Sequence, residues 1–351
     1  MHRIAVWNTA FLGDAVLTLP LLQSLRMRYP AARLDFYVRG GLQALFKAHP
    51  DIDNVYGFDK RGEQHGVSGM LDMGRQLSRC RYDLWISAHS SFRSGFLTLA
   101  SRAAVRIGYH RSVLSRLYYT HLVERRFSEL EEIERLLELL RPLGPGAVSD
   151  SPALALGEKE QASASAFFSE LQVRSDGPVL GLHPGSVWAT KRWPEEAFAH
   201  VGRKALDAGA NVLLFAGPGE EVIAQNVRMR ILGGVEKSRS AFLHDLSGKL
   251  SLPLLAAYIA RLSCYLTNDS GPMHLAWVQG VPVTAIFGPT VRSLGFFPRG
   301  KNSTVFETNL ACRPCGLHGP ATCPLGHHQC MTRIDPEAVW QDARSKLWPG
   351  L

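Results

Sequence analysis

The sequence lacks the long apolar segments of membrane-spanning proteins and the leader layout of exported ones. No run of about eighteen consecutive apolar residues occurs, which is the length that a transmembrane helix needs. The amino terminus, MHRIAVWNTAFLGDAV, has no basic segment followed by an apolar one, the order typical of a signal peptide. We therefore expect a cytoplasmic protein.

A complete dinucleotide-binding glycine motif is also missing. Gly217 and Gly219 follow an apolar run, but Val222 stands where the motif requires its third glycine. The corresponding turn near the amino terminus has Gly13 as its only glycine. These gaps count against a nicotinamide-dependent dehydrogenase.

Recognised nucleic-acid-binding modules are absent, although the formal net charge is +8. Such a charge suits an acidic partner: nucleic acid, an anionic membrane surface, or a phosphorylated or carboxylated substrate. Charge alone does not choose among these, and without a module we expect no nucleic-acid partner.

Short apolar runs alternate with amphipathic stretches along the chain, in two series. The first series contains RIAVWN, LDFYV, NVYGF and YDLWISA, and the second contains PVLGLHPGS, NVLLFAGPG, CYLTNDSG and PVTAIFGPT. This alternation predicts an α/β protein with doubly wound parallel sheets. Ligands bind such sheets at the carboxyl ends of their strands, so two facing halves predict a cleft.

Length and linker composition predict the domain boundaries. At 351 residues, 46% of them hydrophobic, the chain is more consistent with two domains than with one. RPLGPGAVSDSPALAL, rich in proline, glycine and serine, is typical of a linker. We predict domains at 1–150 and 151–335, followed by a helix at 336–351 that could pack back on the first domain.

The first strand end, in NTAFLGDAVLTLP, carries Asp14 at the start of a predicted helix. An acid at that position is commonly an N-cap. It can also face a cleft as a general base, and the two roles do not exclude each other. Pro20 lies inside the amphipathic stretch 15–28, so we expect a kink or an irregular turn there.

The stretch LHPGSVWATKRWPEEAF places Lys191 and Arg192 between a strand and a helix. A cation and a helix amino terminus together suit a diphosphate, although exposed loop lysines are common. Glu220 and Glu221 follow the next strand. They could accept hydrogen bonds from a ribose or be ordinary acids of a first helical turn.

The stretch TNDSGPMHLA combines Asp269, Ser270, Gly271 and His274 where a strand meets a helix. The first amides of that helix could bind an anion while Asp269 binds sugar hydroxyls or caps the helix. Each residue alone is more often structural, but together with Lys191 the group favours a ligand site.

Arginines are concentrated in the first half of the chain. Seven occur between residues 93 and 126 against one acid, Glu124. Such a run is either a solvated surface or a docking face for an anionic acceptor, because the guanidinium fork suits carboxylate and phosphate. The seven are Arg93, Arg102, Arg106, Arg111, Arg116, Arg125 and Arg126.

Four of the six cysteines lie in CRPCGLHGPATCPLGHHQC, at Cys312, Cys315, Cys323 and Cys330. Their C-x2-C-x7-C-x6-C spacing in a reducing compartment predicts a structural metal site more than disulfides, and reduced thiols are the alternative. Zinc and iron both remain open, and the neighbouring His318, His327 and His328 could replace a ligand. Cys80 and Cys264 are typical of ordinary buried cysteines.

The order of LGDAVLTLP, HPGS, TKRWP, AGPGEE, TNDSGPMHLA and FGPT resembles that of the ADP-heptose:lipopolysaccharide heptosyltransferases, glycosyltransferase family 9. The resemblance spans nearly the whole chain. It implies a GT-B fold, in which two Rossmann-like domains bind the acceptor and ADP-heptose respectively. Some members of the wider family hold iron in a similar four-cysteine segment.

The resemblance also implies roles for individual residues. Asp14 corresponds to the catalytic base, Lys191 to the residue that contacts the donor diphosphate, and Glu221 to the acid that holds the ribose. Asp269, Ser270, Gly271 and His274 correspond to residues that line the nucleotide and its phosphates. The remaining candidates are Ser186 and Arg192 for the donor and Gly13, Arg93 and Arg111 for the acceptor.

The implied reaction is an inverting transfer of L-glycero-D-manno-heptose to the inner core of lipopolysaccharide, without a catalytic metal. The TKRWP motif is more similar to that of heptosyltransferase II, which implies the second heptose. The implied acceptor is a Kdo- or heptose-bearing lipid A at the cytoplasmic face of the inner membrane. A heptosyltransferase I acting on Kdo-lipid A, or a family 9 enzyme with a protein or glycan acceptor, are the alternatives.

Three residues depart from the family pattern at the first strand end. Asn8 stands where many relatives have lysine, and Ala10 and Phe11 replace a serine-rich loop. The resemblance therefore does not specify acceptor contacts there. The oligomeric state is not predicted.

Overall fold

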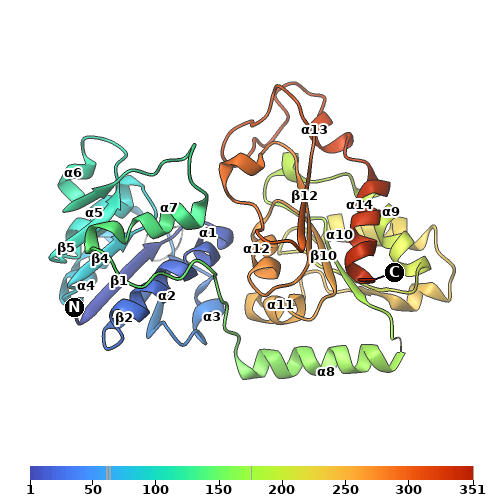
Figure 1. Ribbon diagram of the computed structural model, residues 1–351, viewed down its shortest axis with the longest axis horizontal. Coiled ribbons are helices and arrows are strands. Elements are labelled where there is room, and N and C mark those ends of the chain that lie inside the picture. The colour runs from blue at the N-terminus through green and yellow to red at the C-terminus, as the bar shows by residue number, and fades with distance from the viewer. Residues whose placement is uncertain (61, 63–64, 175, 351) are drawn as a thin grey trace. The chain divides into compact units, whose positions relative to one another are not determined.

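The structure is a computed structural model that describes residues 1–60, 62, 65–174 and 176–350. It divides into two compact units, Met1–Gly157 and Glu158–Leu351. Each unit contains a parallel six-stranded sheet, and Figure 1 shows helices on both sides of each sheet. Within the described residues, no helix has the length and apolar character needed to cross a bilayer.

The sheet of the first unit has the strand order β3-β2-β1-β4-β5-β6, and every neighbouring pair is parallel. The chain reverses its direction of winding between β1 and β4, which is where Rossmann-like sheets bind ligands. The strands are β1 (Arg3–Asn8), β2 (Arg33–Arg39), β3 (Asn54–Phe58), β4 (Leu84–Ser87), β5 (Val105–Tyr109) and β6 (His121–Val123). The helices are α1 (Leu12–Leu17), α2 (Leu19–Arg28), α3 (Gln43–Phe46), α4 (Gly66–Cys80), α5 (Phe92–Ala100), α6 (Ser115–Tyr118) and α7 (Glu132–Glu138), with the 3₁₀ turn η1 (Arg141–Leu143).

The sheet of the second unit has the order β12-β11-β10-β7-β8-β9, again all parallel. Counted from β7, this is the same Rossmann order, with its reversal point between β7 and β10. The strands are β7 (Val179–His183), β8 (Asn211–Leu214), β9 (Leu243–Asp245), β10 (Cys264–Asn268), β11 (Val283–Phe287) and β12 (Ser303–Glu307). The helices are α8 (Glu158–Arg174), α9 (Glu195–Asp207), α10 (Glu221–Leu232), α11 (Leu252–Ile259), α12 (Gly271–Trp277), α13 (Gln329–Thr332) and α14 (Pro336–Leu347), with 3₁₀ turns η2 (Ala189–Lys191), η3 (Arg239–Phe242) and η4 (Arg292–Leu294).

These topologies confirm the predicted fold class of two Rossmann-like sheets. The central strands β7 and β10 are buried along their whole length, because helices cover both faces of a parallel sheet. In the first unit, Trp7 of β1 stacks on Trp85 of β4, and Tyr37 of β2 packs against both rings at a tilt. In the second, α14 packs against α9, and both contribute to the core. Packing of residues 336–351 on the first domain stays a prediction.

The predicted helix over 15–28 is interrupted, as expected from Pro20. The helix α1 ends before Thr18, and α2 begins at Leu19 with Pro20 in its first turn. Proline lacks the N–H that would continue the helical ladder, so the chain restarts the helix instead.

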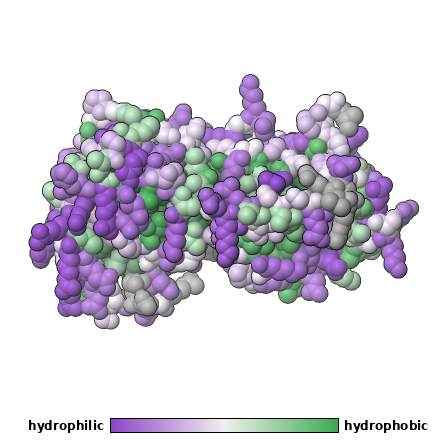
Figure 2. Space-filling model, turned by 90° about the horizontal axis from the view of Figure 1, so that it is seen from below, coloured by the Kyte–Doolittle hydropathy of each residue, from purple (hydrophilic) through white to green (hydrophobic). Residues whose placement is uncertain are grey.

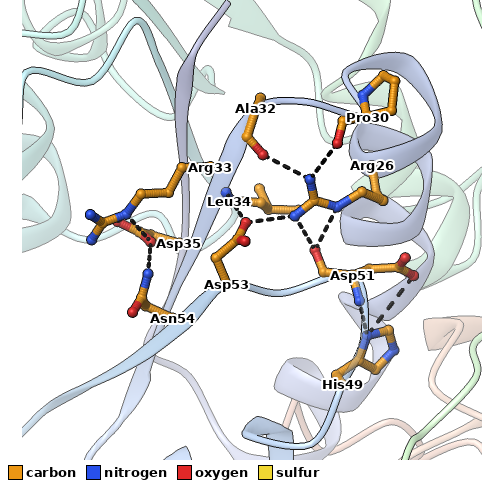
Figure 3. Close-up of polar contacts among 10 residues, drawn as sticks. All are labelled: Arg26, Pro30, Ala32, Arg33, Leu34, Asp35, His49, Asp51, Asp53 and Asn54. Atoms are coloured by element: carbon orange, nitrogen blue, oxygen red, sulfur yellow. Dashed lines mark hydrogen bonds and ion pairs between the residues drawn. The ribbon is translucent and has the colours of Figure 1, made fainter.

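Arg26 joins the amino ends of β2 and β3, as Figure 3 shows. Its guanidinium donates to the backbone oxygens of Pro30, Ala32 and Asp51 at 2.7–3.1 Å and to the carboxylate of Asp53 at 2.6 Å. These bonds pair backbone carbonyls of the segments that precede β2 and β3. The cluster lies at the edge of the sheet opposite the strand ends that bind ligands in this fold, so we assign it a structural role.

The face in Figure 2 shows mainly hydrophilic side chains, with hydrophobic ones in small groups. Isolated exposed apolar residues are normal on a folded protein, whereas a clustered group needs an explanation.

Candidate active site

Asn268 organises the reversal point of the second unit. It lies at the end of β10, is fully buried, and donates to the backbone oxygens of Pro184 at 2.8 Å and Gly185 at 3.3 Å. Its Oδ1 accepts the backbone N–H of Trp193 at 3.0 Å. One amide therefore fixes the loop after β7 from both sides. Lys191 lies between the two attachment points.

Lys191 and Asp269 form a buried ion pair at this point. Nζ of Lys191 donates to Oδ2 of Asp269 at 2.5 Å, and each residue is 8% exposed. The hydroxyl of Thr290, after β11, donates to the same Oδ2 at 2.7 Å. An ammonium has three N–H groups, so Lys191 keeps donors beyond the one that Asp269 accepts.

His274 lies beside this pair, in α12, and is 3% exposed. Burial, the largest cause, lowers the pKa of His274 to about 4; Lys191 acts in the same direction and Asp269 opposes it. The imidazole is therefore neutral at physiological pH. Its Nδ1 is buried without a hydrogen-bond partner among the described residues, which suits an atom that binds a ligand.

Glu220 and Glu221 have different surroundings at the start of α10. Oε2 of Glu220 accepts the backbone N–H of Gly217 at 3.1 Å and lies 3.4 Å from Nε2 of His183. Burial alone would raise the pKa of Glu220, but His183 and the Gly217 amide outweigh it and lower the pKa. Glu221 is exposed and accepts the N–H of Gly219 at 2.8 Å. Its carboxylate, unlike that of Glu220, faces solvent.

The remaining predicted donor residues lie at the same strand ends. Nε of Arg192 donates to the backbone oxygen of Ser186 at 2.8 Å, and Ser186 is buried. Ser270 precedes α12, and its hydroxyl lies 3.2 Å from that of Thr267; Gly271 is the first residue of the helix. The structure thus brings Lys191, Asp269 and His274 into one group.

The four-cysteine segment contacts the loop that carries Lys191. Thr190 donates its hydroxyl to the backbone oxygen of Pro320, and Nε2 of His328 lies 2.8 Å from the backbone oxygen of Thr190. The N–H of Cys315 donates to the oxygen of Pro289 at 2.8 Å. The segment is therefore part of the wall around the Lys191–Asp269 pair. His328 faces that loop through its Nε2.

Arg313 makes the most extensive of these contacts, and its side chain is 5% exposed. It donates to the backbone oxygens of Phe287, Gly288, Thr290 and Thr308 and to the carboxylate of Glu307. The guanidinium thereby holds the turn after β11 that presents Thr290 to Asp269. Sequence reasoning did not select Thr290, Asn268 or Arg313.

The four thiols of this segment are free and lie within electrostatic range of one another. Backbone N–H groups of His328 and of residues 325–327 lie near the Cys323 thiol and lower its pKa. However, no group of three or more His, Cys, Asp or Glu side chains in the described part of the chain is arranged to hold a metal ion. The thiols would have to move together to bind one.

In the first unit, Asp14 lies in α1 but not at the N-cap position. The helix starts at Leu12, so the N-cap is Phe11 and Asp14 is the third helical residue. Oδ2 of Asp14 accepts the N–H of Phe11 at 3.2 Å, which still satisfies a backbone donor of the first turn. The carboxylate is half-buried at the carboxyl end of β1, where a base can meet a substrate. Gly13 is buried in the same turn.

His89 lies across the reversal point from β1, just after β4. Its Nδ1 is 3.1 Å from the hydroxyl of Ser94 and 3.3 Å from that of Thr9. Burial, followed by the positive charges of Lys60, Arg125 and Arg111, lowers the pKa of His89 to about 4. Sequence reasoning missed His89, although it directly follows the predicted strand YDLWISA.

Five of the seven arginines of residues 93–126 divide into two groups by their contacts. Arg106 donates to the oxygens of Ala103 and Tyr118, Arg125 pairs with Glu132 at 2.7 Å, and Arg126 pairs with Glu129 at 2.6 Å. These three stabilise the fold. Arg111 donates to the oxygen of Ser90, beside His89, at 2.6 Å and is otherwise exposed, and Arg93 is half-buried in the first turn of α5.

Comparisons with known proteins agree with this architecture. The sequence model of glycosyltransferase family 9 (heptosyltransferase) matches residues 70–321. Lipooligosaccharide heptosyltransferase 2 of Campylobacter jejuni is 26% identical over 348 residues, which cover 98% of each chain. The family 9 glycosyl transferase from Veillonella parvula has a TM-score of 0.85 at 25% identity, covering 99% of this chain and 97% of that one. ADP-heptose lipopolysaccharide heptosyltransferase II of Escherichia coli shares the fold, with a TM-score of 0.76 at 22% identity and coverage of 99% and 98%.

Proposed function

The chain belongs to glycosyltransferase family 9, the heptosyltransferases, and on this premise we propose that it transfers heptose from ADP-heptose to the inner core of lipopolysaccharide. The observation that carries the proposal is the buried group of Lys191, Asp269, Thr290 and His274 at the reversal point of the second sheet. In this fold that point binds nucleotides. The names of the relatives indicate the transferred sugar.

For the donor, we assign the diphosphate to Lys191 and Arg192, aided by Ser186, Ser270 and Gly271. Lys191 is buried, so little water screens its charge, and its electrostatic attraction to a phosphate is stronger than that of an exposed lysine. Glu221 is the candidate for the ribose because its carboxylate is exposed, and Nδ1 of His274 is available to the donor. These cations take the role that a divalent metal has elsewhere, so no catalytic metal is proposed.

For the chemistry, Asp14 acts as general base. It accepts the proton of the acceptor hydroxyl as that oxygen attacks the anomeric carbon from the face opposite ADP. The bond from that carbon to the diphosphate oxygen breaks, and Lys191 stabilises the negative charge of the leaving group. A single displacement inverts the anomeric configuration, so a β-linked donor gives an α-linked heptose.

For the acceptor, the carboxyl edge of the first sheet suits an anionic sugar. Lys60, Arg111 and Arg125 all act on His89, and of these Arg125 is paired with an acid. The excess positive charge there matches the carboxylates and phosphates of a Kdo-containing core. Gly13 and Arg93 belong to the same edge. The second heptose is the proposed position, in line with the Campylobacter relative.

For the four-cysteine segment, we propose a structural zinc or iron ion bound by Cys312, Cys315, Cys323 and Cys330. Support comes from their spacing and mutual proximity, and the proposal requires the thiols to close around the ion. The ion has no part in the reaction. Its role would be to stabilise the segment that contacts the Lys191 loop.

The acceptor assignment is tested with purified protein, ADP-heptose and two acceptors. We expect faster transfer to monoheptosylated Kdo-lipid A than to Kdo-lipid A, measured as initial rates by mass spectrometry. The reverse preference would make the protein a first heptosyltransferase. Transfer to neither acceptor would direct the search to a protein or another glycan.

A further inference from the structure

Four large apolar side chains are exposed at one corner of the first unit. Val113 is 80% exposed, Phe92 67%, Leu117 63% and Leu114 50%. Phe92 begins α5, and the other three lie in the turn leading into α6 and in α6 itself, which packs against α5. We call these four residues the apolar corner. Their number and exposure distinguish them from isolated surface hydrophobics.

The backbone around the apolar corner is firmly held, so the exposure does not come from loose structure. The hydroxyl of Ser115, which is buried, accepts the N–H groups of Arg111 at 3.1 Å and Ser112 at 3.2 Å. Tyr118 packs so tightly on Gly95 that a Cβ at Gly95 would lie 2.3 Å from its ring. The turn thus buries its polar serine and presents its aliphatic residues to solvent, the reverse of the usual pattern.

Positive charge surrounds the apolar corner. Residues 84–123 contain five arginines and no Asp or Glu. Arg93 is next to Phe92 in sequence, and Arg111 and Arg116 flank Val113 and Leu114. Both Arg111 and Arg116 are exposed. Apolar residues bordered by arginine are the combination that binds the headgroup region of an anionic bilayer.

The apolar corner lies on the substrate side of the sheet. Phe92 follows the carboxyl end of β4, and the turn at 112–118 follows the carboxyl end of β5. Asp14 follows the carboxyl end of β1 in the same parallel sheet. A lipid-anchored acceptor would therefore enter at the edge that the apolar corner borders.

We propose that the apolar corner inserts into the bilayer surface that holds the acceptor lipid, while Arg116 contacts anionic headgroups and Arg93 and Arg111 remain with the core sugars of the acceptor. The inference rests on the proposed function, because that function makes the acceptor a membrane lipid. A second copy of the chain fits less well as the occupant, since a symmetric contact would bring these arginines against one another.

The test is sedimentation of the full chain with vesicles of phosphatidylcholine, with and without phosphatidylglycerol. The test variant is Val113→Ser/Leu117→Ser. The matched control is Val222→Ser/Met229→Ser, which removes side chains that are 68% and 60% exposed on α10 of the second unit. We expect wild type and control to bind the anionic vesicles alike. The test variant should partition about tenfold less, because two aliphatic side chains no longer enter the bilayer.

A charge variant separates the two contributions. Arg116→Gln should weaken binding to the anionic vesicles and leave binding to neutral vesicles unchanged, and added salt should reproduce this loss. Equal sedimentation of the test variant and wild type, or no binding of wild type to anionic vesicles, would overturn the proposal. So would a wild-type dimer that the test variant dissociates in size-exclusion chromatography, since a second copy would then be the occupant.

Failure of the proposed function gives a different result. The test variant should bind ADP as wild type does and should transfer heptose normally to a delipidated, water-soluble acceptor. A protein that sediments with vesicles as expected but transfers no heptose would refute the function and leave the docking surface standing. Loss of transfer to the soluble acceptor in the test variant alone would assign the apolar corner to the catalytic site instead.

Discussion

Arg313 offers a sharp test of whether the four-cysteine segment positions the donor site. Arg313→Lys replaces a planar fork by a single ammonium with three N–H groups. Of the five hydrogen bonds that Arg313 donates within the described residues, at least two must be lost. At roughly 1 kcal/mol or slightly more for each, the free energy of unfolding should fall by about 2–3 kcal/mol.

Arg26→Lys is the matched control for this variant. Arg26 also donates five hydrogen bonds, mostly to backbone oxygens, but at the amino edge of the first sheet. The same count predicts a similar loss of about 2–3 kcal/mol. The two variants should therefore be equally destabilised by urea, and they should differ only in what they do to the donor.

The expected effect on the donor comes from the link between Arg313 and Lys191. When Arg313 releases the turn after β11, Thr290 no longer holds Oδ2 of Asp269, to which Lys191 is paired. Losing one hydrogen bond of this kind weakens ADP binding about threefold to tenfold. Isothermal titration should show this loss for Arg313→Lys and none for Arg26→Lys.

Thr290→Val removes the same link without touching Arg313. It should weaken ADP binding to a similar extent, and the double variant should bind ADP no more weakly than either single one, because both changes break one connection. Unchanged ADP affinity in Arg313→Lys, or equal losses in Arg313→Lys and Arg26→Lys, would refute the reasoning. In either case the segment would stabilise the fold without positioning the donor.

Four further changes test other parts of the account. Asp14→Asn should leave ADP affinity and the melting temperature near wild type while lowering turnover by roughly two to four powers of ten, and turnover within a few-fold of wild type would exclude Asp14 as the base. Lys191→Ala should weaken ADP binding measured without added metal, and an unchanged Kd would remove Lys191 from the site. Protein purified without chelator should contain about one zinc or iron per chain, and Cys312→Ser should lose both the metal and stability; metal analysis that detects neither ion would leave the cluster as thiols. Because burial depresses the folded pKa of His274 to about 4, its contribution to stability is present above its unfolded pKa of about 6.5 and is lost as pH falls towards 4. Urea titrations should therefore show an acid-dependent loss up to about 3 kcal/mol larger in wild type than in His274→Gln, and parallel pH profiles would contradict this.

The central strands of both sheets could be predicted from the sequence because they are buried on both faces and so form continuous apolar runs. The predicted run RIAVWN coincides with β1, and CYLTNDSG begins with β10. NVYGF coincides with β3, although β3 is a half-buried edge strand. The strands β5, β6, β9 and β12 were not predicted. β6 and β9 are edge strands of three residues each, and β5 (VRIGY) and β12 (STVFE) carry polar or charged residues, so the apolar signal of all four is weak.

The site was predictable in part, for a related reason. Lys191, Asp269 and His274 stand at strand ends, and strand ends can be found from the sequence. Asn268, Thr290 and Arg313 act through hydrogen bonds between segments far apart in the chain, which no local pattern encodes. The alternative that Asp14 is the N-cap was wrong. The N-cap is Phe11, three positions earlier, because the helix begins at Leu12 and not after the Gly13-Asp14 pair.

The most direct test of the proposed function is the structure of the product. Purified protein, ADP-β-heptose and monoheptosylated Kdo-lipid A are incubated without added metal, and the product is examined by mass spectrometry and by NMR of the anomeric proton. The account predicts a mass gain of one heptose and an α-configured linkage, since Asp14 activates the acceptor for a single inverting displacement. A β-configured product, or a donor consumed without any glycosylated acceptor, would contradict it.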